Sequence, residues 1–309
     1  LYGGTINLMG KSFRKFGWNA VFVDNDNPEA FRAAVTEKTR AIFVESLANP
    51  GGVIVDLEAI AKIAQEAEVP LIVDNTMATP WLCRPFEWGA DLVVHSTTKF
   101  LSGQGNAMGG IVIDSGRFPW FGNAKYPSLS EPCPDYNGLT FAETFGDMAF
   151  TLYSHAVSLR DLGCTQSPMN AWITLNGVET LPLRMERHVE NAQKVAGFLQ
   201  QHPSVEWVSY AGLSSSPYYQ LAQKYLQGKA GSVFTFGIRG GYESGLRLLE
   251  KVELFSHVSN IGDSRSLILH PASTTHRQLS DEQRLTAGAG PEVIRLSVGI
   301  ESAEDLIAD

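Results

Sequence analysis

The sequence predicts an α/β protein with a large domain on a mostly parallel sheet and a smaller α+β domain after it. Three observations favour this fold class. The chain has 309 residues, which is about twice the usual domain length. A strand–helix–strand pattern fills residues 40–74, and shorter alternations follow a long helix predicted at residues 183–201. We therefore expect a large domain over residues 1–183 and a C-terminal domain over residues 184–309.

The strand–helix–strand pattern is the main evidence for a parallel sheet. Apolar runs at residues 41–44 and 70–73 are typical of strands that are buried on both faces. Between them, apolar residues recur at helical spacing over residues 57–64, and Asp56 can cap that helix. Such a unit has parallel strands and a right-handed crossover. Further strands of the large domain are predicted at residues 91–94 and 110–113.

The pattern changes after the last of these strands. Residues 117–139 are rich in proline and aromatic residues, and they predict a long structureless stretch. Stretches of that length usually serve a functional site or an oligomer contact. The C-terminal domain is then expected to contain strands at residues 205–210, 232–238, 266–270 and 293–298, and helices at residues 218–226 and 242–251.

Composition excludes several classes of protein. Hydrophobic residues make up 44% and charged residues 18% of the chain, which is an ordinary globular balance. No apolar run reaches the roughly 18 to 20 residues that span a bilayer, so no membrane span is expected. A net charge of -9 without a basic cluster argues against a nucleic-acid partner. The 3 widely spaced cysteines and the scattered histidines predict no disulfide framework and no metal site, and they favour the cytoplasm.

Polar residues follow three consecutive strands of the predicted sheet. Because open parallel sheets bind ligands beyond the carboxyl ends of their strands, these residues are expected to form one site. The first strand is followed by Glu45 and Asn49, the second by Asp74, and the third by Ser96, Thr98 and Lys99.

Lys99 is the centre of this predicted site. A partly desolvated lysine has a lowered pKa and can form a Schiff base. Asp74 is a carboxylate that could face a pyridinium nitrogen, while Ser96 and Thr98 are hydroxyl donors suited to a phosphate. These are the groups that pyridoxal phosphate requires. Each residue alone has a plainer explanation, such as a solvated loop lysine or a turn aspartate, but their shared position at strand ends favours a cofactor site.

Two residues allow a different interpretation. Ser96 and Lys99 also fit the S-x-x-K motif of serine acyl-enzymes. That motif places its serine at the start of a helix, whereas this serine follows a strand, and neither S-D-N nor K-T-G occurs in the chain.

Arg295 is predicted to share one strand face with Val293 and Ser297, so it either lies at a sheet edge or clamps a carboxylate.

With these motifs the sequence resembles the Cys/Met-metabolism family of pyridoxal-phosphate enzymes. The resemblance implies fold type I of the PLP-dependent transferases, which is the aminotransferase-like fold. Within the family the chain is most similar to the O-acetylhomoserine sulfhydrylase (homocysteine synthase) branch, on a proline-rich insert that ends in YNGL and on the stretches ETFG, NIGD and HPASTTH. The stretches shared with the whole family are LYGGT at Tyr2, ESLANPGG at Glu45, IVDNTMATP at Asp74, HSTTKFLSGQG at Lys99, LRMERH at Arg184 and RLSVGIE at Arg295.

The resemblance implies a role for each candidate residue. Lys99 would form the Schiff base with the cofactor and move protons. Asp74 would keep the pyridine nitrogen protonated, and Tyr2 would stack on the ring as a second catalytic residue. The cofactor phosphate would be bound by Ser96 and Thr98, and the substrate would be held by Arg295, Asn49 and Asn260.

The implied activity is γ-replacement in methionine biosynthesis, in which O-acetyl-L-homoserine and sulfide give L-homocysteine and acetate. Methionine γ-lyase and cystathionine γ-synthase are the alternatives within the family. The leaving group and the sulfur donor, free sulfide or a sulfur carrier, stay open. The resemblance also implies a homotetramer built from dimers, with no nucleic-acid or membrane partner.

One departure from the family pattern favours a further alternative. Family members carry a segment before LYGGT that supplies a Gly-Met phosphate loop, and a Tyr and an Arg that reach the neighbouring subunit's site. This chain begins at Leu1, which we interpret as the start of a fragment or of the ordered part of a longer chain. A non-catalytic partner subunit is therefore the alternative from outside the enzymes.

Overall fold

The computed structural model describes residues 1–49, 52–275, 277–278 and 280–309. Pro50, Gly51 and His276, which fall within quoted motifs, lie outside the described residues. The strands are β1 (Ile42–Glu45), β2 (Leu71–Asp74), β3 (Leu92–Ser96), β4 (Gly110–Asp114), β5 (Val205–Ser209), β6 (Val233–Ile238), β7 (Ser256–His257), β8 (Leu267–Leu269) and β9 (Val293–Ser297). The helices are α1 (Gly3–Asn7), α2 (Pro28–Ala34), α3 (Leu57–Glu66), α4 (Thr79–Leu82), α5 (Pro127–Ser130), α6 (Phe141–Phe145), α7 (Ala149–Tyr153), α8 (Arg160–Leu162), α9 (Pro168–Glu179), α10 (Leu181–Gln201), α11 (Tyr219–Tyr225), α12 (Gly241–Lys251), α13 (Asp281–Thr286) and α14 (Ala303–Ala308).

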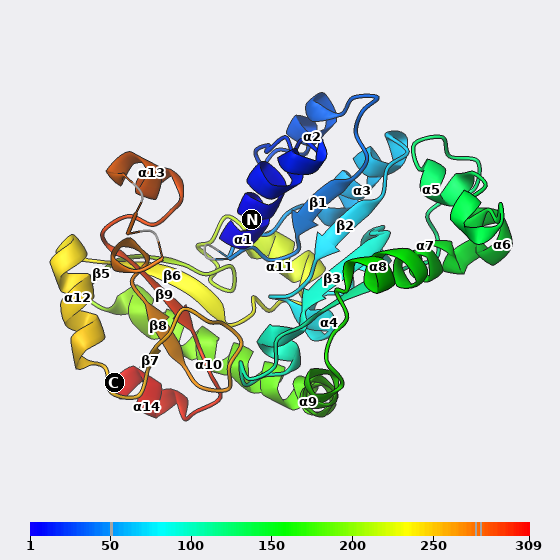
Figure 1. Ribbon diagram of the computed structural model, residues 1–309. Coiled ribbons are helices and arrows are strands. Elements are labelled where there is room, and N and C mark those ends of the chain that lie inside the picture. Colours follow the sequence, from blue (N-terminus) through cyan, green and yellow to red (C-terminus); the bar gives the residue numbers. More distant parts are fainter. Residues whose placement is uncertain (50–51, 276, 279) are drawn as a thin grey trace.

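The first sheet has four strands in the order β1-β2-β3-β4 (Figure 1). The strands β1, β2 and β3 are parallel, and β4 joins β3 antiparallel, so the predicted mostly parallel sheet is confirmed. Each parallel strand runs as far as its predicted polar residue. Glu45 therefore pairs directly with Asp74 across the β1–β2 ladder, which brings two carboxyl groups to one edge of the sheet.

The predicted strand–helix–strand unit is present between β1 and β2. The Asp56 side chain accepts a hydrogen bond from the Ala59 amide at 3.2 Å and caps α3, as the sequence predicts. The apolar stripe of α3 is buried against the sheet, because parallel strands need a covering helix on each face. The buried residues of α3 are Leu57, Ile60, Ile63 and Ala64.

The prediction that residues 117–139 are structureless was wrong. This stretch contains α5 and packs with α6 and α7 around a small aromatic core of its own, in which Trp120 stacks on Phe150 at 5.4 Å between ring centroids. Its prolines interrupt the helices, so no periodic pattern marks the stretch in the sequence. The buried members of this core are Phe118, Trp120, Leu129, Phe141, Ala142 and Ala149.

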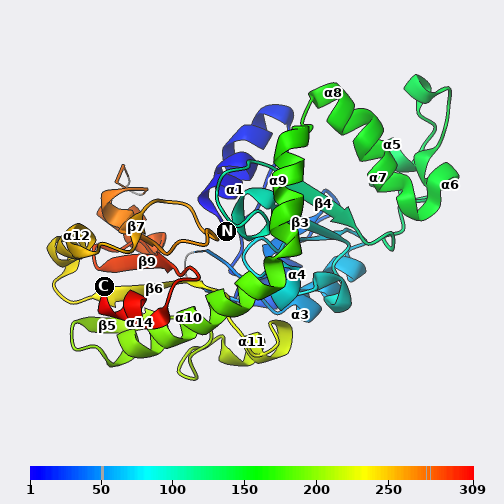
Figure 2. The same cartoon turned by 90° about the horizontal axis from the view of Figure 1, so that it is seen from below.

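The second sheet has five strands in the order β5-β6-β9-β8-β7, built wholly from the C-terminal part of the chain. Figure 2 shows α10 lying along this sheet, with α14 beside it. The long predicted helix thus exists but begins at Leu181, and Pro182 lies in its first turn, where no amide partner is needed. One apolar core joins residues of both sheets. Among the described residues, no helix is long and apolar enough to span a membrane.

Candidate active site

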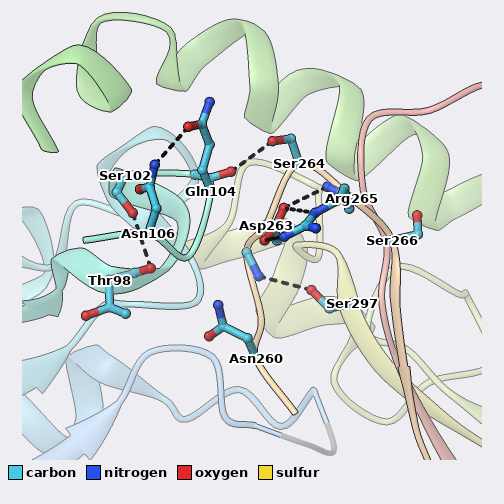
Figure 3. Close-up of polar contacts among 12 residues, drawn as sticks. Thr98, Ser102, Gln104, Asn106, Asn260, Asp263, Ser264, Arg265, Ser266 and Ser297 are labelled. Carbon is cyan, nitrogen blue, oxygen red and sulfur yellow. Dashed lines mark hydrogen bonds and ion pairs between the residues drawn. The ribbon is translucent and has the colours of Figure 1, made fainter. Parts of the chain in front are cut away.

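The candidate site lies where the loop after β3 meets the loop between β7 and β8. Figure 3 shows the polar residues of these two loops, with Thr98 and Gln104 on one side and Asn260 and Asp263 on the other. The hydroxyl and the amide of Ser264 both bond the Gly103 carbonyl, at 3.0 and 2.8 Å. The two sheets therefore hold the site between them.

Lys99 lies in a short π-helical turn, Thr97–Leu101, that follows β3 directly. Its own backbone departs from helical geometry, with φ -93° and ψ -130°. Its half-buried amine donates a hydrogen bond to the Asn260 side-chain oxygen at 2.5 Å. Burial first, and then the cation of Arg295, lower the pKa of this amine. A lysine with a lowered pKa is neutral and nucleophilic in a larger fraction of molecules.

Asp74 ends β2 beside a second buried carboxyl group. Its Oδ1 accepts a hydrogen bond from the Thr76 amide at 2.9 Å, and burial raises its pKa. Glu45 is only 5% exposed, and burial raises its pKa as well. The sequence places Glu45 at the site but assigns it no role, and the available signal is a charged residue that ends an apolar strand.

Tyr2 is tied to this carboxyl pair through its backbone. Its amide donates to Glu45 Oε1 at 2.5 Å, while Glu45 Oε2 is buried and has no partner among the described residues. The side chain of Tyr2 is 55% exposed. An exposed aromatic side chain whose backbone is bonded to a desolvated carboxyl group is available to stack on a flat heterocycle.

The hydroxyl groups predicted for the phosphate have different surroundings. The Ser96 amide donates to Thr76 Oγ1 at 2.8 Å, which fixes the end of β3. The Thr98 hydroxyl donates to the Gly109 carbonyl at 3.3 Å and accepts from the Gly109 amide at 3.1 Å. Thr98 is thus already bonded to backbone, and binding a phosphate would require it to exchange these bonds.

Arg295 lies on β9, which has β6 on one side and β8 on the other. It is therefore not at a sheet edge, and this excludes one of the two interpretations of its strand. Its guanidinium donates to Asn49 Oδ1 at 3.4 Å and to the Ser259 and Asn260 carbonyls at 2.9 and 3.3 Å. Burial lowers its pKa to about 10. No carboxylate neutralises Arg295 within the described part of the chain, which leaves it suited to an anionic ligand.

The residues present fit pyridoxal phosphate. The site combines a half-buried amine with a lowered pKa, an adjoining pair of carboxyl groups with raised pKa values, and a guanidinium that has no counterion among the described residues. The Lys99 amine and the Arg295 guanidinium both bond Asn260, and the carboxyl groups end the neighbouring strands β1 and β2. A protonated ring nitrogen would supply the cation that Asp74 lacks. In contrast, no cluster of three His, Cys, Asp or Glu residues suited to a metal ion occurs among the residues that the structure describes.

Comparison with known proteins bears on this fit. The profile of the family described as "Cys/Met metabolism PLP-dependent enzyme" matches residues 1–309. The O-acetyl-L-homoserine sulfhydrylase of Leptospira meyeri is 50% identical over 100% of this chain and 72% of its own length. The O-acetyl-L-homoserine sulfhydrylase 1 of Thermus thermophilus is 49% identical over 100% of this chain and 74% of its own length.

A solved structure agrees with the sequence relatives. The crystal structure of a Campylobacter jejuni protein described as an O-acetylhomoserine (thiol)-lyase superposes with a TM-score of 0.96 at 42% identity, and covers 100% of this chain and 74% of that one. That structure contains N'-pyridoxyl-lysine-5'-monophosphate. The predicted fold type and cofactor are thereby confirmed. The chain belongs to the Cys/Met-metabolism family of PLP-dependent enzymes.

Proposed function

We propose that the protein catalyses γ-replacement on O-acetyl-L-homoserine, with sulfide as the nucleophile and L-homocysteine and acetate as products, as a step of methionine biosynthesis. The names of relatives that are 42–50% identical over the whole chain support this activity. The observation that carries it is the hydrogen-bonded series in which Lys99 contacts the Asn260 side chain and Arg295 contacts the Asn260 carbonyl. A base and a carboxylate-binding group are thereby held against the same residue, Asn260.

Each candidate residue has a part in the proposed reaction. Pyridoxal phosphate supplies, when bound, an electron sink for the bonds at the substrate α carbon. Lys99 removes the α proton and then transfers protons at the β carbon, because its lowered pKa suits both directions. Asp74 keeps the ring nitrogen protonated, and Tyr2 covers the ring. The phosphate is assigned to Ser96 and Thr98, and the substrate carboxylate to Arg295 and Asn49 with Asn260 beside them.

The overall reaction balances without an oxidant or a reductant. The C–O bond at the γ carbon breaks and acetate leaves with its electron pair, and a C–S bond to hydrosulfide forms at the same carbon. The protons that leave the α and β carbons return to them. Arg295 holds the carboxylate so that the reacting bond keeps a fixed orientation, and such orientation supplies much of the rate in related chemistry.

Product analysis tests this function against its alternatives. The purified protein, loaded with pyridoxal phosphate, is incubated with O-acetyl-L-homoserine with and without sulfide. We expect homocysteine that depends on sulfide. Release of 2-oxobutyrate in place of homocysteine would favour methionine γ-lyase, and cystathionine formed with cysteine would favour cystathionine γ-synthase. Comparison of O-acetyl, O-succinyl and O-phospho substrates, and of free and carrier-bound sulfur, decides the leaving group and the donor.

The non-catalytic alternative requires a separate measurement. If Lys99 holds the cofactor, the protein shows a visible absorbance band, and borohydride fixes a pyridoxyl adduct on Lys99. The variant Lys99→Ala should lose both signals and all turnover, while Lys38→Ala, on an exposed loop, should keep them. A parent protein without the band would exclude the proposed function.

The proposal extends to the organisation of the protein. Residues 1–183 would form the large domain and residues 184–309 the C-terminal domain, supported by two sheets that share no strand. A homotetramer is supported by exposed apolar side chains on β4 and α9, where Val112 is 57% and Trp172 61% exposed. The cytoplasm is supported by Cys83, Cys133 and Cys164, which are free thiols.

A further inference from the structure

Three polar side chains on one face of α10 bind backbone carbonyl groups from three different segments. Arg184, His188 and Asn191 lie about one helical turn apart, and we call them the carbonyl-binding stripe. One of the bound segments follows Lys99 directly, another follows the strand that carries Arg295, and the third is the end of α9 at Gly177. Chain segments that leave a sheet have unpaired carbonyls, and buried donors must satisfy them.

Arg184 holds the segment after Lys99. Its Nη1 donates to the Phe100 carbonyl at 2.8 Å, and its Nη2 donates to the Leu101 carbonyl at 3.4 Å and to the Gly177 carbonyl at 2.6 Å. No carboxylate forms an ion pair with Arg184 within the described ranges, and burial lowers its pKa. The guanidinium is partly buried, and its Nε also donates to the Thr180 hydroxyl at 3.1 Å. Several donors in fixed directions need the planar fork of arginine.

Two glycines allow this close packing. A Cβ atom on Gly103 would lie 2.3 Å from Arg184 Nη1, and a Cβ atom on Gly177 would lie 2.3 Å from the Leu101 carbonyl oxygen. A side chain at Gly177 would clash with backbone, and one at Gly103 would displace the Arg184 guanidinium. The loop after Lys99 is thus enclosed by the end of α9 and the start of α10, with the guanidinium between them.

His188 and Asn191 hold the segment after Arg295. His188 Nδ1 lies 2.7 Å from the Val298 carbonyl, and burial lowers the pKa of the ring to about 4, so the ring is neutral and Nδ1 donates. Asn191 Nδ2 donates to the Gly299 and Glu301 carbonyls at 3.0 and 2.8 Å. The His188 ring also packs edge-on against Phe100, with 5.4 Å between centroids, which links the two segments.

We infer that the carbonyl-binding stripe of α10 sets the separation between Lys99 and Arg295, and that Arg184 and Asn191 are therefore positioning residues for the reaction. Arg184 fixes the loop that carries the base, and Asn191 fixes the segment behind the carboxylate-binding strand. The inference rests on the proposed function insofar as Lys99 and Arg295 act on one substrate. A rigid helix is a better spacer than a loop, since backbone bonds set its length.

The test compares Arg184→Met and Arg184→Lys with Arg187→Met, each as holoenzyme. Arg187 is the matched control, because it lies on the same helix, is 55% exposed and only pairs with Glu190 at 3.8 Å. We expect Arg184→Met to lower kcat by about a hundredfold, the loss that a misplacement near 1 Å causes, with KM changed less than about threefold. The kcat of Arg184→Lys should lie between those of Arg184→Met and the parent, and the kcat of Arg187→Met should equal that of the parent.

Hydrogen exchange gives a readout that needs no particular substrate. Amides at residues 100–103 should exchange faster in both Arg184 variants, whereas Asn191→Ala should loosen residues 298–301 and raise KM. The inference is overturned if the Arg184 variants keep the parent kcat and the parent exchange at residues 100–103 and differ only in melting temperature. A parent that does not turn over O-acetylhomoserine would refute the proposed function, and the exchange data would still decide whether the stripe holds the two segments.

Discussion

At the scale of single residues, the site combines two basic groups that form no ion pair with a carboxylate among the described residues with two desolvated carboxyl groups. Lys99 and Arg295 are both half-buried. Asp74 and Glu45 are desolvated at the ends of the neighbouring strands β2 and β1. Separated groups of this kind are costly to fold, and a zwitterionic substrate or a charged cofactor would stabilise them. The electrostatics therefore favour a site that binds a ligand rather than one that supports the fold.

Replacing Arg295 should change both substrate binding and Lys99. We expect Arg295→Leu to raise KM for the amino-acid substrate about a hundredfold, because a carboxylate loses a charge-assisted pair of hydrogen bonds. Since the Arg295 cation helps to lower the pKa of the Lys99 amine, its loss should raise that pKa. The measurement is the rate at which apoprotein captures pyridoxal phosphate as a function of pH, and its midpoint should move to higher pH.

Arg295→Lys separates these two effects. Lysine keeps the cation but cannot donate two bonds in a fixed geometry. We expect its KM to rise while the pH midpoint of cofactor capture stays near that of the parent. An equal midpoint in Arg295→Leu and the parent would contradict the electrostatic link between the two residues.

Removing the charge of Glu45 should stabilise the apoprotein near neutral pH. Burial raises the pKa of Glu45, so the folded state favours the protonated form, and stability is lost as pH rises through the folded pKa. Glu45→Gln keeps an acceptor for the Tyr2 amide and does not lose stability in this way. Near neutral pH we expect its free energy of unfolding to exceed that of the parent by about 1 kcal/mol. The difference should vanish below the unfolded pKa, near 4.5.

Denaturant unfolding at neutral and acidic pH measures this difference. The control is Glu87→Gln, because Glu87 is a surface residue that pairs with Arg84 at 3.1 Å with both side chains more than half exposed. Exposed ion pairs of this kind contribute little to the free energy of unfolding, so Glu87→Gln should be about as stable as the parent. A Glu45→Gln protein that is less stable than the parent at every pH would show that the carboxylate form is favoured.

The sequence identifies the strand-end residues of the site but not their contacts. Lys99, Asp74 and Arg295 stand out because each is charged beside an apolar run. The structure joins Lys99 and Arg295 through Asn260, and it places Asp74 at the end of the strand next to β3. The hydrogen bond between Lys99 and Asn260 could not be foreseen, since it joins residues 161 positions apart. Likewise, Glu45 Oε2 has no hydrogen-bond partner among the described residues, and this follows only from the folded chain.

At the scale of elements, the loop between β7 and β8 depends on a glycine. Gly262 has φ +72°, and a Cβ atom there would lie 2.6 Å from the Phe100 amide nitrogen. The Gly262 amide also donates to Ser297 Oγ at 3.0 Å. This loop carries Asn260, so its close approach to the loop after β3 brings Asn260 to Lys99.

Gly262→Ala should therefore destabilise the fold and separate the two loops. We expect a loss of about 2–4 kcal/mol, which combines left-handed backbone strain with a backbone clash. Gly138→Ala is the matched control, because Gly138 has φ +77° with nothing within 4 Å of its Cβ position. We expect Gly138→Ala to lower the free energy of unfolding by only about 1 kcal/mol. Equal losses in the two variants, measured by guanidinium unfolding, would show that strain alone is responsible.

Elements with a regular period were predicted well, and those without one were not. The unit from β1 to β2 follows directly from its apolar spacing and from the Asp56 cap. The two-residue strand β7 is too short to carry a period. Residues 117–139 fold around their own aromatic cluster, and aromatic contacts among residues distant in sequence leave no periodic pattern.

At the scale of the whole molecule, the surface formed by α9 and β4 is rich in exposed apolar side chains. On α9 the side chains of Met169, Trp172 and Leu175 are 61–63% exposed, at a spacing of three residues along the helix. The Asn170 side chain bonds the Met108 carbonyl at 2.8 Å, and this contact ties α9 to the segment that precedes β4. Figure 2 shows α9 next to β3 and β4. Sheet edges and apolar stripes of this kind are normally covered by a partner.

Charging this surface should dissociate the proposed oligomer. We expect the parent to sediment as a dimer or tetramer and Trp172→Glu as a smaller species, because a buried carboxylate without a partner opposes association. Phe198→Glu on α10 is the control, since Phe198 is 40% exposed and lies outside the α9–β4 surface. Since α9 also contacts the loop after Lys99 through Gly177, dissociation should lower turnover as well. A parent that sediments as a monomer at all concentrations, or a Trp172→Glu protein that associates like the parent, would contradict this surface as the subunit contact.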